Sequence, residues 1–282
     1  MNVEKLLAVP PLPLVSRHNN TLLTIGNFDG CHLGHQQLIA QTVALAKQEK
    51  ATACAMIFDP SPAHFFSKQV SAPLFTQEQK IRAFSELGIQ TLFLQTFDAA
   101  FASLSDQAFY ERIRDQLGLK GIVVGDDFCF GSKRSGNTKK LRGLTARDHL
   151  LFATSPCYHL SSNEKISSSH IREALEKNEN LKEVEALLGR PYLVEATLKS
   201  ASSASSLLLQ PDTQLLPRVG AYQGQCWWGE GTQRPPVMRP NLTLPPCTLL
   251  VSASGGIEVR VDSNTLPTAL PTRWGIYLRS SV

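Results

Sequence analysis

Two histidines, an aspartate and three glycines lie close together in residues 24–38, which read TIGNFDGCHLGHQQL. A strand-forming run precedes this stretch and a helix-forming run follows it. The N–H groups and dipole of a helix start favour an anion, glycines let it approach closely, and histidines can donate to phosphate oxygens. The stretch therefore indicates a phosphate site. A metal site on His32, His35 and Asp29, or a purely structural role in packing and capping, stays open on these residues alone.

A second polar stretch, GDDFCFGSKRSG, covers residues 125–136 and directly follows a strand-like run. In an open parallel sheet, ligands bind at the carboxyl ends of the strands. Two carboxylates, Asp127 among them, two phenylalanines, Phe128 among them, and a Lys-Arg pair suit a planar heterocycle that carries phosphate. A solvent-facing turn with two core aromatic rings is the simpler interpretation of the same residues.

The third stretch, KISSSHIR at residues 165–172, places three consecutive serines where a helix begins. Hydroxyl groups and the exposed N–H groups of a helix start can together hold an anion, and a guanidinium one turn later can clamp phosphate oxygens. Capping needs only one serine, so the run of Ser167, Ser168 and Ser169 before Arg172 favours a second anion site over a capped helix with a solvated arginine.

Composition limits the classes of protein to which this chain can belong. With 282 residues and 42% hydrophobic content it can bury the cores of two domains, and its net charge of +4 argues against a nucleic-acid partner. The six cysteines are scattered, which indicates reduced thiols. The early apolar run is broken by prolines, which argues against a signal peptide or a membrane span. We expect a cytoplasmic protein with no membrane partner, and the sequence does not indicate an oligomeric state.

Strand and helix signals alternate through the first two thirds of the chain. Thr76 and Gln79 form a capping box, Ser105 is an N-cap, and Gly88 ends a helix. The alternation predicts an α/β fold with a parallel sheet and helices on both faces. The expected strands are 21–25, 51–58, 91–97 and 121–125, and the expected helices are 33–48, 76–88, 105–117, 168–178 and 180–188.

The character of the sequence changes at GRPY, residues 189–192. Proline, serine, glycine and threonine are frequent beyond it, and short strand-like runs replace the helical periodicity. This pattern predicts a small antiparallel β-barrel. The low-complexity stretch 199–206, KSASSASS, is expected to form a flexible loop. The predicted domains are therefore 1–188 and 189–282.

Six ordered motifs, GNFDGCHLGHQQL, FDPSP, FTQEQKIRAFSELGI, GDDFCFGSKRSG, ISSSHIR and LLGRPY, resemble the bacterial bifunctional riboflavin kinase/FMN adenylyltransferase (FAD synthetase) family over about residues 20–192. The resemblance implies a Rossmann-like nucleotidyltransferase domain of the HxGH class. It also implies transfer of AMP from ATP to FMN, giving FAD and pyrophosphate, with Mg²⁺ held mainly by the substrate phosphates and water.

The same resemblance implies the roles of individual residues. His32, His35 and Arg172 are the expected catalytic residues, because they can neutralise the charge that spreads over the phosphate oxygens. The residues expected to bind ATP and flavin are Gly26, Asn27, Phe28, Asp29, Gly30, Gly34, Asp127, Phe128, Ser167, Ser168 and Ser169. No metal ligand is assigned to the protein itself.

The chain departs from the family pattern at two places. Ser61 stands where the family motif F-x-P-H-P has histidine, which puts the choice of flavin in question. The stretch after GRPY has neither a glycine-rich loop nor P-T-A-N, so we expect riboflavin kinase activity to be lost. The leading expectation is a monofunctional FMN adenylyltransferase. The alternatives are a non-catalytic flavin- or nucleotide-binding regulatory paralogue and an HxGH-class transferase with another acceptor.

Overall fold

The computed structural model describes residues 1–6, 20–67, 72–159, 165–177, 181–230, 232–238, 243–267 and 269–279. The chain forms two compact units. The sheet unit comprises Met1–Phe28, Gly34–Val70 and Phe84–Lys165, and the barrel unit comprises Asp29–Leu33, Ser71–Ala83 and Ile166–Val282. The predicted boundary near residue 189 stays a prediction, and each unit is described here by itself.

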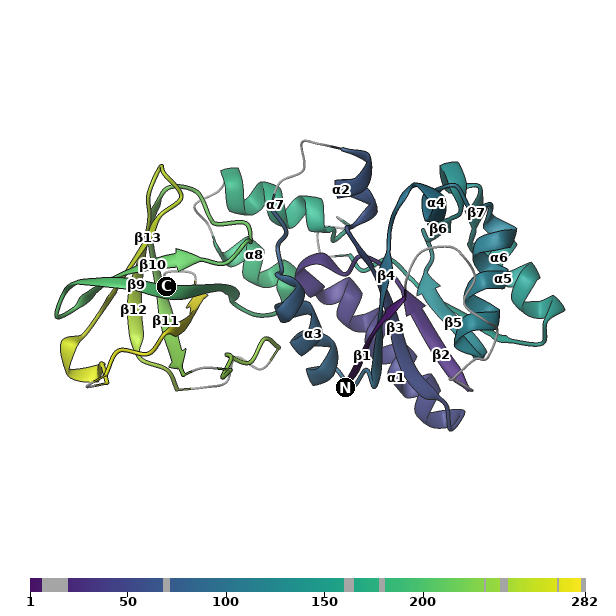
Figure 1. Ribbon diagram of the computed structural model, residues 1–282, viewed down its shortest axis with the longest axis horizontal. Coiled ribbons are helices and arrows are strands. Elements are labelled where there is room, and N and C mark those ends of the chain that lie inside the picture. The colour runs from purple at the N-terminus through teal and green to yellow at the C-terminus, as the bar shows by residue number, and fades with distance from the viewer. Residues whose placement is uncertain are drawn as a thin grey trace. The chain divides into compact units, whose positions relative to one another are not determined.

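The sheet unit contains six parallel strands in the order β1-β4-β3-β2-β5-β8 (Figure 1). The chain runs from β2 through β3 and β4 toward one edge and returns on the other side of β2 with β5 and β8. The strands are β1 (Asn2–Leu6), β2 (Thr21–Ile25), β3 (Thr52–Asp59), β4 (Thr91–Thr96), β5 (Leu119–Gly125) and β8 (Leu151–Ser155). A separate short pair joins β6 (Cys129–Phe130) to β7 (Gly136–Asn137).

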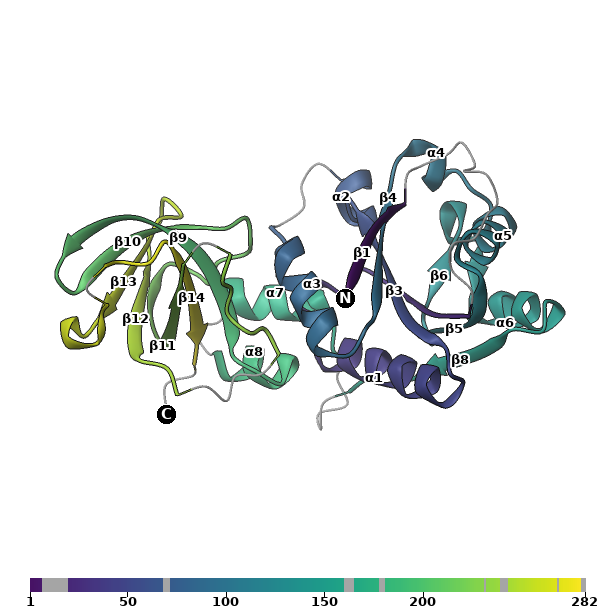
Figure 2. The same cartoon turned by 60° about the horizontal axis from the view of Figure 1, so that its bottom comes forward.

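Helices lie on both sides of this sheet, with α1 along one side and α4 and α5 on the other (Figure 2). Ser105 caps α5 by accepting from the backbone N–H of Ala108 at 3.1 Å, and Gly118 ends it in the left-handed conformation. The helices are α1 (Leu33–Gln48), α2 (Pro62–Phe66), α3 (Gln77–Glu86), α4 (Ala99–Ala102), α5 (Asp106–Leu117) and α6 (Thr138–Arg147).

The core of the sheet unit lies between the strands and α5. Side chains from β2, β3, β4 and β5 meet apolar residues that recur at helical spacing along α5, which is why that helix docks on the sheet. The buried members of this core include Leu23, Ile25, Met56, Phe93, Phe109, Tyr110, Ile113, Ile122 and Val124.

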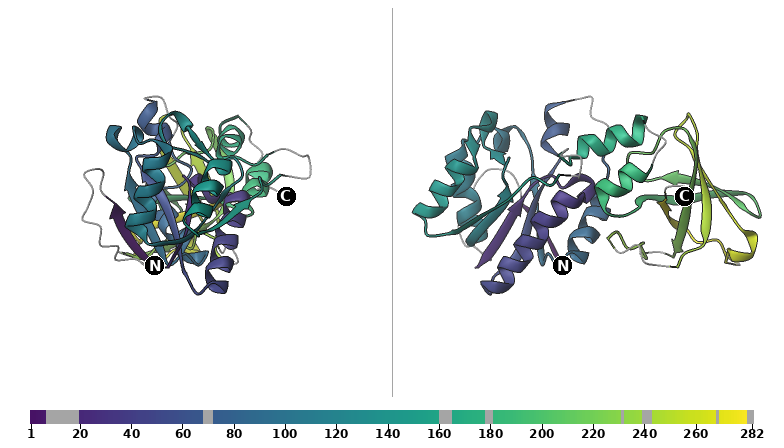
Figure 3. Two further views of the ribbon diagram at one scale, coloured as in Figure 1. Left: turned by 90° about the vertical axis from the view of Figure 1, so that its right-hand side faces the viewer. Right: turned by 180° about the vertical axis from the view of Figure 1, so that it is seen from behind.

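The barrel unit contains a closed antiparallel barrel in the order β10-β13-β12-β11-β14-β9, which the right panel of Figure 3 shows from behind. Inward side chains alternate with exposed ones along β13, as a half-buried strand requires. The strands are β9 (Tyr192–Ser203), β10 (Ser206–Pro211), β11 (Gly220–Gly229), β12 (Pro246–Val251), β13 (Ile257–Val261) and β14 (Arg273–Leu278). Helices α7 (Ser168–Lys177) and α8 (Leu181–Leu188) precede the barrel.

The parallel sheet, the barrel and all the predicted helices and strands are confirmed within one to three residues. The capping box is also confirmed: Thr76 N–H donates to Gln79 Oε1 at 2.9 Å, and Gln79 N–H donates to Thr76 Oγ1 at 3.1 Å. The predicted loop at 199–206 is wrong. Residues 199–203 form the end of β9, 204 and 205 form a tight turn, and Ser206 starts β10, so backbone pairing in a hairpin overrides the weak strand propensity of serine and alanine. In the part of the chain that the structure describes, no helix is long and apolar enough to cross a membrane.

Candidate active site

The strand order of the sheet unit brings two of the three predicted stretches to one edge. Strands β2 and β5 pair directly, with Thr24 opposite Val123, and the order of strands reverses between them. The crevice outside the carboxyl ends of strands at such a reversal is the usual ligand site of an open α/β sheet. Residues 26–28 leave β2 and residues 126–128 leave β5 at this edge, so both stretches are placed for ligand contact.

Phe28 is an internal support of the first stretch. Its backbone has a φ of 50°, and its ring is only 1% exposed. The ring centroid lies 5.1 Å from that of His35, in the first turn of α1, and a Cβ at Gly26 would come within 3.1 Å of the Phe28 ring. Glycine at residue 26 therefore lets the ring fold back beneath the turn, where it packs against the imidazole of His35.

The start of α1 is also fastened to β8. Gln37 Nε2 donates to Ser155 Oγ at 3.3 Å, and Gln41 Nε2 donates to the carbonyl of Thr154 at 3.4 Å. The backbone carbonyl of Ser155 in turn accepts from the backbone N–H of Asp126 at 3.0 Å. The N-terminal part of α1 and the loop after β5 are thereby held to the same strand.

The loop after β5 is open to solvent. The carboxylate of Asp127 is 62% exposed and pairs with Lys165 Nζ at 2.5 Å. The thiol of Cys157 donates to Asp126 Oδ1 at 2.9 Å, and this hydrogen bond lowers the pKa of that carboxyl group. Phe128 stacks on Phe130 with the ring centroids 5.6 Å apart and the planes within 16°. The loop therefore offers a flat aromatic surface beside paired charges.

In the barrel unit, Asp29 is the centre of a hydrogen-bond network. Its carboxylate accepts the backbone N–H groups of Leu74 and Phe75 at 3.2 and 3.1 Å and forms an ion pair with Arg172. A second nitrogen of Arg172 donates to the carbonyl of Ala72 at 2.5 Å. Asp29 and Arg172, 143 positions apart, are thus brought together around the segment 72–75.

The three serines at the start of α7 have different surroundings. Ser167 Oγ accepts the N–H of His170 at 3.2 Å, which caps the helix. Ser168 Oγ donates to the backbone carbonyl of Asp29 at 2.8 Å, and Ser169 is exposed. His170 continues the network toward α8, where its Nε2 lies 2.8 Å from a Glu183 carboxylate oxygen.

Residues 29–33 form a tight turn in which Gly30 and Cys31 both have positive φ, at 74° and 43°. Burial raises the pKa of the Cys31 thiol to about 12, while the nearby Arg190 and Lys80 act in the opposite direction. Arg190 Nη2 donates to the carbonyl of Gly30 at 2.7 Å. His32, which directly precedes α1, is 7% exposed. The backbone of this turn is thus restrained on several sides.

Ser61 lies next to an imidazole. Ser61 Oγ accepts the N–H of His64 at 3.3 Å, capping α2, and lies 2.9 Å from His64 Nδ1. Serine has no ring of its own, but the imidazole of His64, three residues later, lies next to Ser61. Phe66 beside it is 72% exposed, so the surface here is aromatic.

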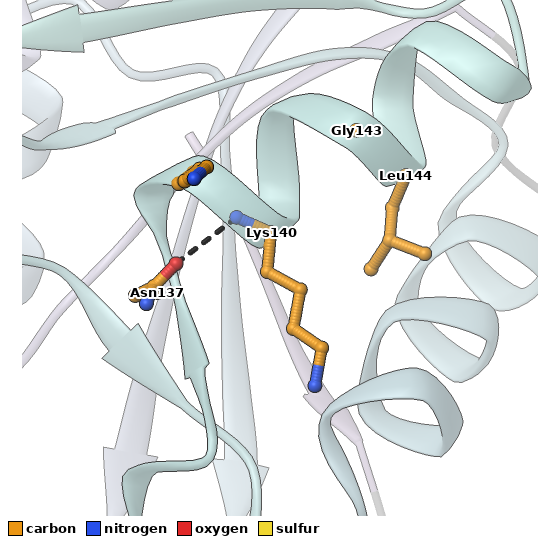
Figure 4. Close-up of a pocket in the computed structure, with 5 residues that line it drawn as sticks. Asn137, Lys140, Gly143 and Leu144 are labelled. Carbon is orange, nitrogen blue, oxygen red and sulfur yellow. Dashed lines mark hydrogen bonds between the residues drawn. The ribbon is translucent and has the colours of Figure 1, made fainter.

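The predicted residues thus fall into two groups. Those of the sheet unit are Gly26, Asn27, Phe28, Gly34, His35, Asp127 and Phe128, and those of the barrel unit are Asp29, Gly30, His32, Ser167, Ser168, Ser169 and Arg172. Their catalytic and binding roles stay predictions. A pocket beside α6 contains none of them (Figure 4); its lining residues are Asn137, Lys139, Lys140, Gly143 and Leu144.

Sequence reasoning missed the segment 72–75 and Arg190 as supports of the turn. Arg190 lies in the LLGRPY motif, and this membership in a motif is the signal that could have drawn attention to it. The acceptor role of the Ala72 carbonyl leaves no mark in the sequence, because any residue supplies that group.

The parallel sheet with its glycine-rich turn, followed by a closed antiparallel barrel, defines a nucleotidyltransferase-like α/β protein of the HxGH class with an attached barrel domain. A family model described as FAD synthetase matches residues 14–170. Because this match covers more than half of the 282 residues, the chain belongs to the FAD synthetase family.

Several curated relatives carry the name bifunctional riboflavin kinase/FMN adenylyltransferase. The relative from Buchnera aphidicola is 33% identical over 202 residues, which is 71% of this chain and 64% of the relative. The Listeria monocytogenes relative is 30% identical over 213 residues, covering 72% and 67% of the two chains. The relative from Escherichia coli K12 is 32% identical over 175 residues, which is 61% of this chain and 55% of the relative. This chain therefore spans between half and two thirds of the length of most of these relatives.

A solved structure also has this fold. The crystal structure titled macrolide-efflux protein from Streptococcus pneumoniae matches with a TM-score of 0.80, covering 100% of this chain and 91% of that chain. The sequence identity is 19%, so the likeness establishes the shared fold alone.

Proposed function

We propose that this protein is an FMN adenylyltransferase that transfers AMP from ATP to FMN and releases pyrophosphate. The observation that carries the proposal is the match of residues 14–170 to the FAD synthetase family, since this range holds every predicted site residue except Arg172. The convergence of residues 26–28 and 126–128 at the reversal of strand order supports it independently.

The proposed reaction asks little of a general base. An FMN phosphate oxygen, already an anion, attacks the α-phosphorus of ATP, a P–O bond forms, and the bond to the pyrophosphate oxygen breaks. The protein has to align the two groups and stabilise the charge that grows on the phosphate oxygens. We assign the stabilisation to His32, His35 and the N–H groups at the start of α1.

We propose that Arg172 binds the β- and γ-phosphates of ATP. In the structure its guanidinium is engaged by Asp29 and by the carbonyl of Ala72. A guanidinium has five N–H donors, so these two partners leave donors for phosphate, and the fixed guanidinium plane suits bidentate contact. Asp29 thereby serves as an orienting partner of the arginine, while Ser168 and Ser169 contribute hydroxyl groups at the start of α7.

The residues fit a magnesium ion that is bound through ATP. The Asp29 carboxylate is occupied by two N–H groups and Arg172, and that of Asp127 by Lys165. Among the residues that the structure describes, one group of three ligand atoms lies within 4.8 Å, on Asp126, Asp127 and Cys157, and it includes a thiol, which Mg²⁺ does not favour. Bound Mg²⁺ would neutralise phosphate charge, with its ligands coming mainly from ATP and water.

The aromatic surface after β5 and the exposed ring of Phe66 suit the flavin ring system. We therefore propose FMN as the acceptor, with Phe128 as a ring contact. His64 beside Ser61 offers an imidazole where the family motif has histidine, which supports retention of flavin binding in spite of the serine.

We further propose that the barrel has lost riboflavin kinase activity. The stretch lacks P-T-A-N, and its polar groups are engaged with one another. Arg273 donates to both carboxylate oxygens of Asp212 at 3.0 and 2.6 Å. Gln214 accepts the N–H of Glu195 at 3.1 Å and donates to the carbonyl of Leu193 at 2.9 Å. The missing motif carries this proposal, and the hydrogen bonds of these side chains indicate that they support the barrel itself.

One assay tests both parts of the proposal. The purified protein is incubated with Mg-ATP and either FMN or riboflavin, and the flavins are separated by chromatography. We expect FAD from FMN and no FMN from riboflavin. Formation of FMN from riboflavin would contradict the loss of the kinase. Absence of FAD, with FMN binding retained in equilibrium dialysis, would favour the non-catalytic flavin-binding alternative.

A further inference from the structure

Arg190 is a buried cation to which the proposed reaction assigns no role. It lies between the end of α8 at Leu188 and the start of β9 at Tyr192, and it is 3% exposed. Its Nη2 donates to the carbonyl of Gly30 at 2.7 Å, and Nη1 lies 3.3 Å from the carbonyl of Pro191. Burying a guanidinium is costly unless its donors find acceptors, so the contact with Gly30 is a substantial constraint on both groups.

The residues on either side of Arg190 fit closely against the same turn. Gly189 has a φ of 68°, and a Cβ there would lie 2.5 Å from Leu33 Cδ2. A Cβ on Gly30 would lie 2.9 Å from Leu74 Cδ1 and 3.7 Å from Leu188 Cδ2. Positive φ favours glycine at residues 30 and 189, and these contacts place residues 188–190 directly against the turn.

The guanidinium of Arg190 is itself held in place. Its Cζ lies 4.7 Å from the centroid of the Phe75 ring, and the backbone N–H of Phe75 donates to the Asp29 carboxylate. The hydroxyl of Tyr192, at the start of β9, lies 3.1 Å from the carbonyl of Leu74. The first residues of the barrel and the residues 72–75 thus restrain Asp29 and Gly30 together.

We propose that Arg190 is a positioning residue for the turn that carries His32, and this inference rests on the proposed adenylyl transfer. A left-handed backbone at a non-glycine residue such as Cys31 is strained and persists only when its surroundings fix it. The hydrogen bond from Arg190 fixes the peptide plane between Gly30 and Cys31. Without it the turn relaxes toward less strained dihedrals, and His32, the next residue, leaves its position.

The test compares Arg190→Met with Arg273→Met. Arg273 is a partly buried arginine of the barrel unit, and its partners are Thr197, Asp212 and Glu195, none of which belongs to the turn at residues 29–33. We expect Arg190→Met to lower kcat for FAD formation about 10- to 100-fold with little change in KM for FMN, because a small misplacement of a catalytic group has that effect. Arg273→Met is expected to lower the melting temperature but to keep kcat within about twofold of the wild type at a temperature where both are folded.

Hydrogen exchange measured by mass spectrometry supplies a readout that does not need activity. Exchange in the peptide that covers residues 29–35 is expected to rise in Arg190→Met and to stay at the wild-type level in Arg273→Met. Arg190→Lys keeps the charge and a single donor nitrogen, and it is expected to give intermediate values of kcat and exchange. This variant is used for the test if Arg190→Met does not fold.

The proposal is overturned if a folded Arg190 variant keeps both wild-type kcat and wild-type exchange in residues 29–35. It is equally overturned if the two methionine variants lose activity in proportion to their loss of stability. If the wild type forms no FAD, the proposed function fails, and the exchange measurement alone still decides whether Arg190 holds the turn.

Discussion

The turn at residues 29–33 and the loop at residues 126–134 both carry predicted site residues, yet they are built in opposite ways. The turn is buried, and the groups on Asp29 and Gly30 have partners from residues 72–75, from α7 and from Arg190. The side chain of Asp127 in the loop is largely exposed, and its ion-pair partner, Lys165, is itself a surface lysine.

This difference separates two tasks that the proposed reaction requires. Phosphate groups are alike in every nucleotide, so a fixed geometry serves them well and preorganisation lowers the barrier. A ring system differs between acceptors, and a loop with exposed charged residues beside the partly buried Phe128 can adjust to it. We infer that the turn governs the rate of transfer and that the loop governs the choice of acceptor.

The largest effect is expected from His32→Ala. Removing a preorganised donor from the turn should lower kcat by about 10²- to 10³-fold. Steady-state FAD formation measures the loss, and circular dichroism checks that the fold is intact. Unchanged FAD synthesis in the folded variant would contradict the role of His32 and the assignment of rate control to the turn.

Asp29→Ala is expected to lower the free energy of unfolding by about 3 kcal/mol. The substitution removes the acceptor of two buried N–H groups and leaves Arg172 without its carboxylate partner. Urea denaturation measures the change. Asp115→Ala is the matched control, because the pair of Asp115 with Arg114 is more exposed and should contribute less than about 1 kcal/mol. Equal losses in the two variants would show that the turn is not specially restrained.

Asp127→Asn should change the free energy of unfolding by less than about 1 kcal/mol, since its ion pair with Lys165 is exposed on both sides. If the loop governs acceptor choice, the variant alters KM for FMN more than it alters kcat. Steady-state kinetics at varied FMN concentration distinguishes the two. A fall in kcat as large as that expected for His32→Ala would contradict the inference that the turn governs the rate and the loop governs the choice of acceptor.

The last comparison needs no substitution and uses the reactivity of one cysteine in each region, Cys31 in the turn and Cys129 in the loop. Cys31 is 3% exposed, and burial raises its pKa to about 12, so it should stay a protonated, unreactive thiol up to about pH 10. Cys129, in the loop, is partly exposed and should react with a maleimide in the native protein. Peptide mass spectrometry after labelling at pH 7.5 identifies the modified residue. Labelling of Cys31 at the rate of Cys129 would show that the turn opens readily.

The sequence predicted those elements whose local signals agree with the tertiary structure. Strand β2 is short, mostly apolar and buried along its whole length because it is covered on both faces, and α5 has both a serine cap and a glycine stop. Helix α6 was missed because its ten residues have few apolar members to mark a periodic face, and β8 because most of its residues are only partly buried.

The candidate residues were found because they lie in contiguous motifs, whereas their partners were not. The ion pair of Asp29 with Arg172 joins residues 143 positions apart, and the Arg190 contact joins residues 160 positions apart. Spacing along the chain carries no information about such pairs. The sequence also could not show which of the three serines caps α7 and which contacts Asp29, because this depends on how the helix packs. In the structure Ser167 caps the helix and Ser168 donates to the carbonyl of Asp29.

The two ends of strand β9 differ in burial. Its first residues, 192–196, are buried beside the turn supports, and its last, 199–203, are exposed in the hairpin with β10. Protein engineers could therefore insert an epitope or a fluorescent label at the exposed residues 203–205 at little cost. A graft of the nucleotide-binding module onto another protein would have to carry residues 190–196 with it, so the transferable part does not end where the barrel begins.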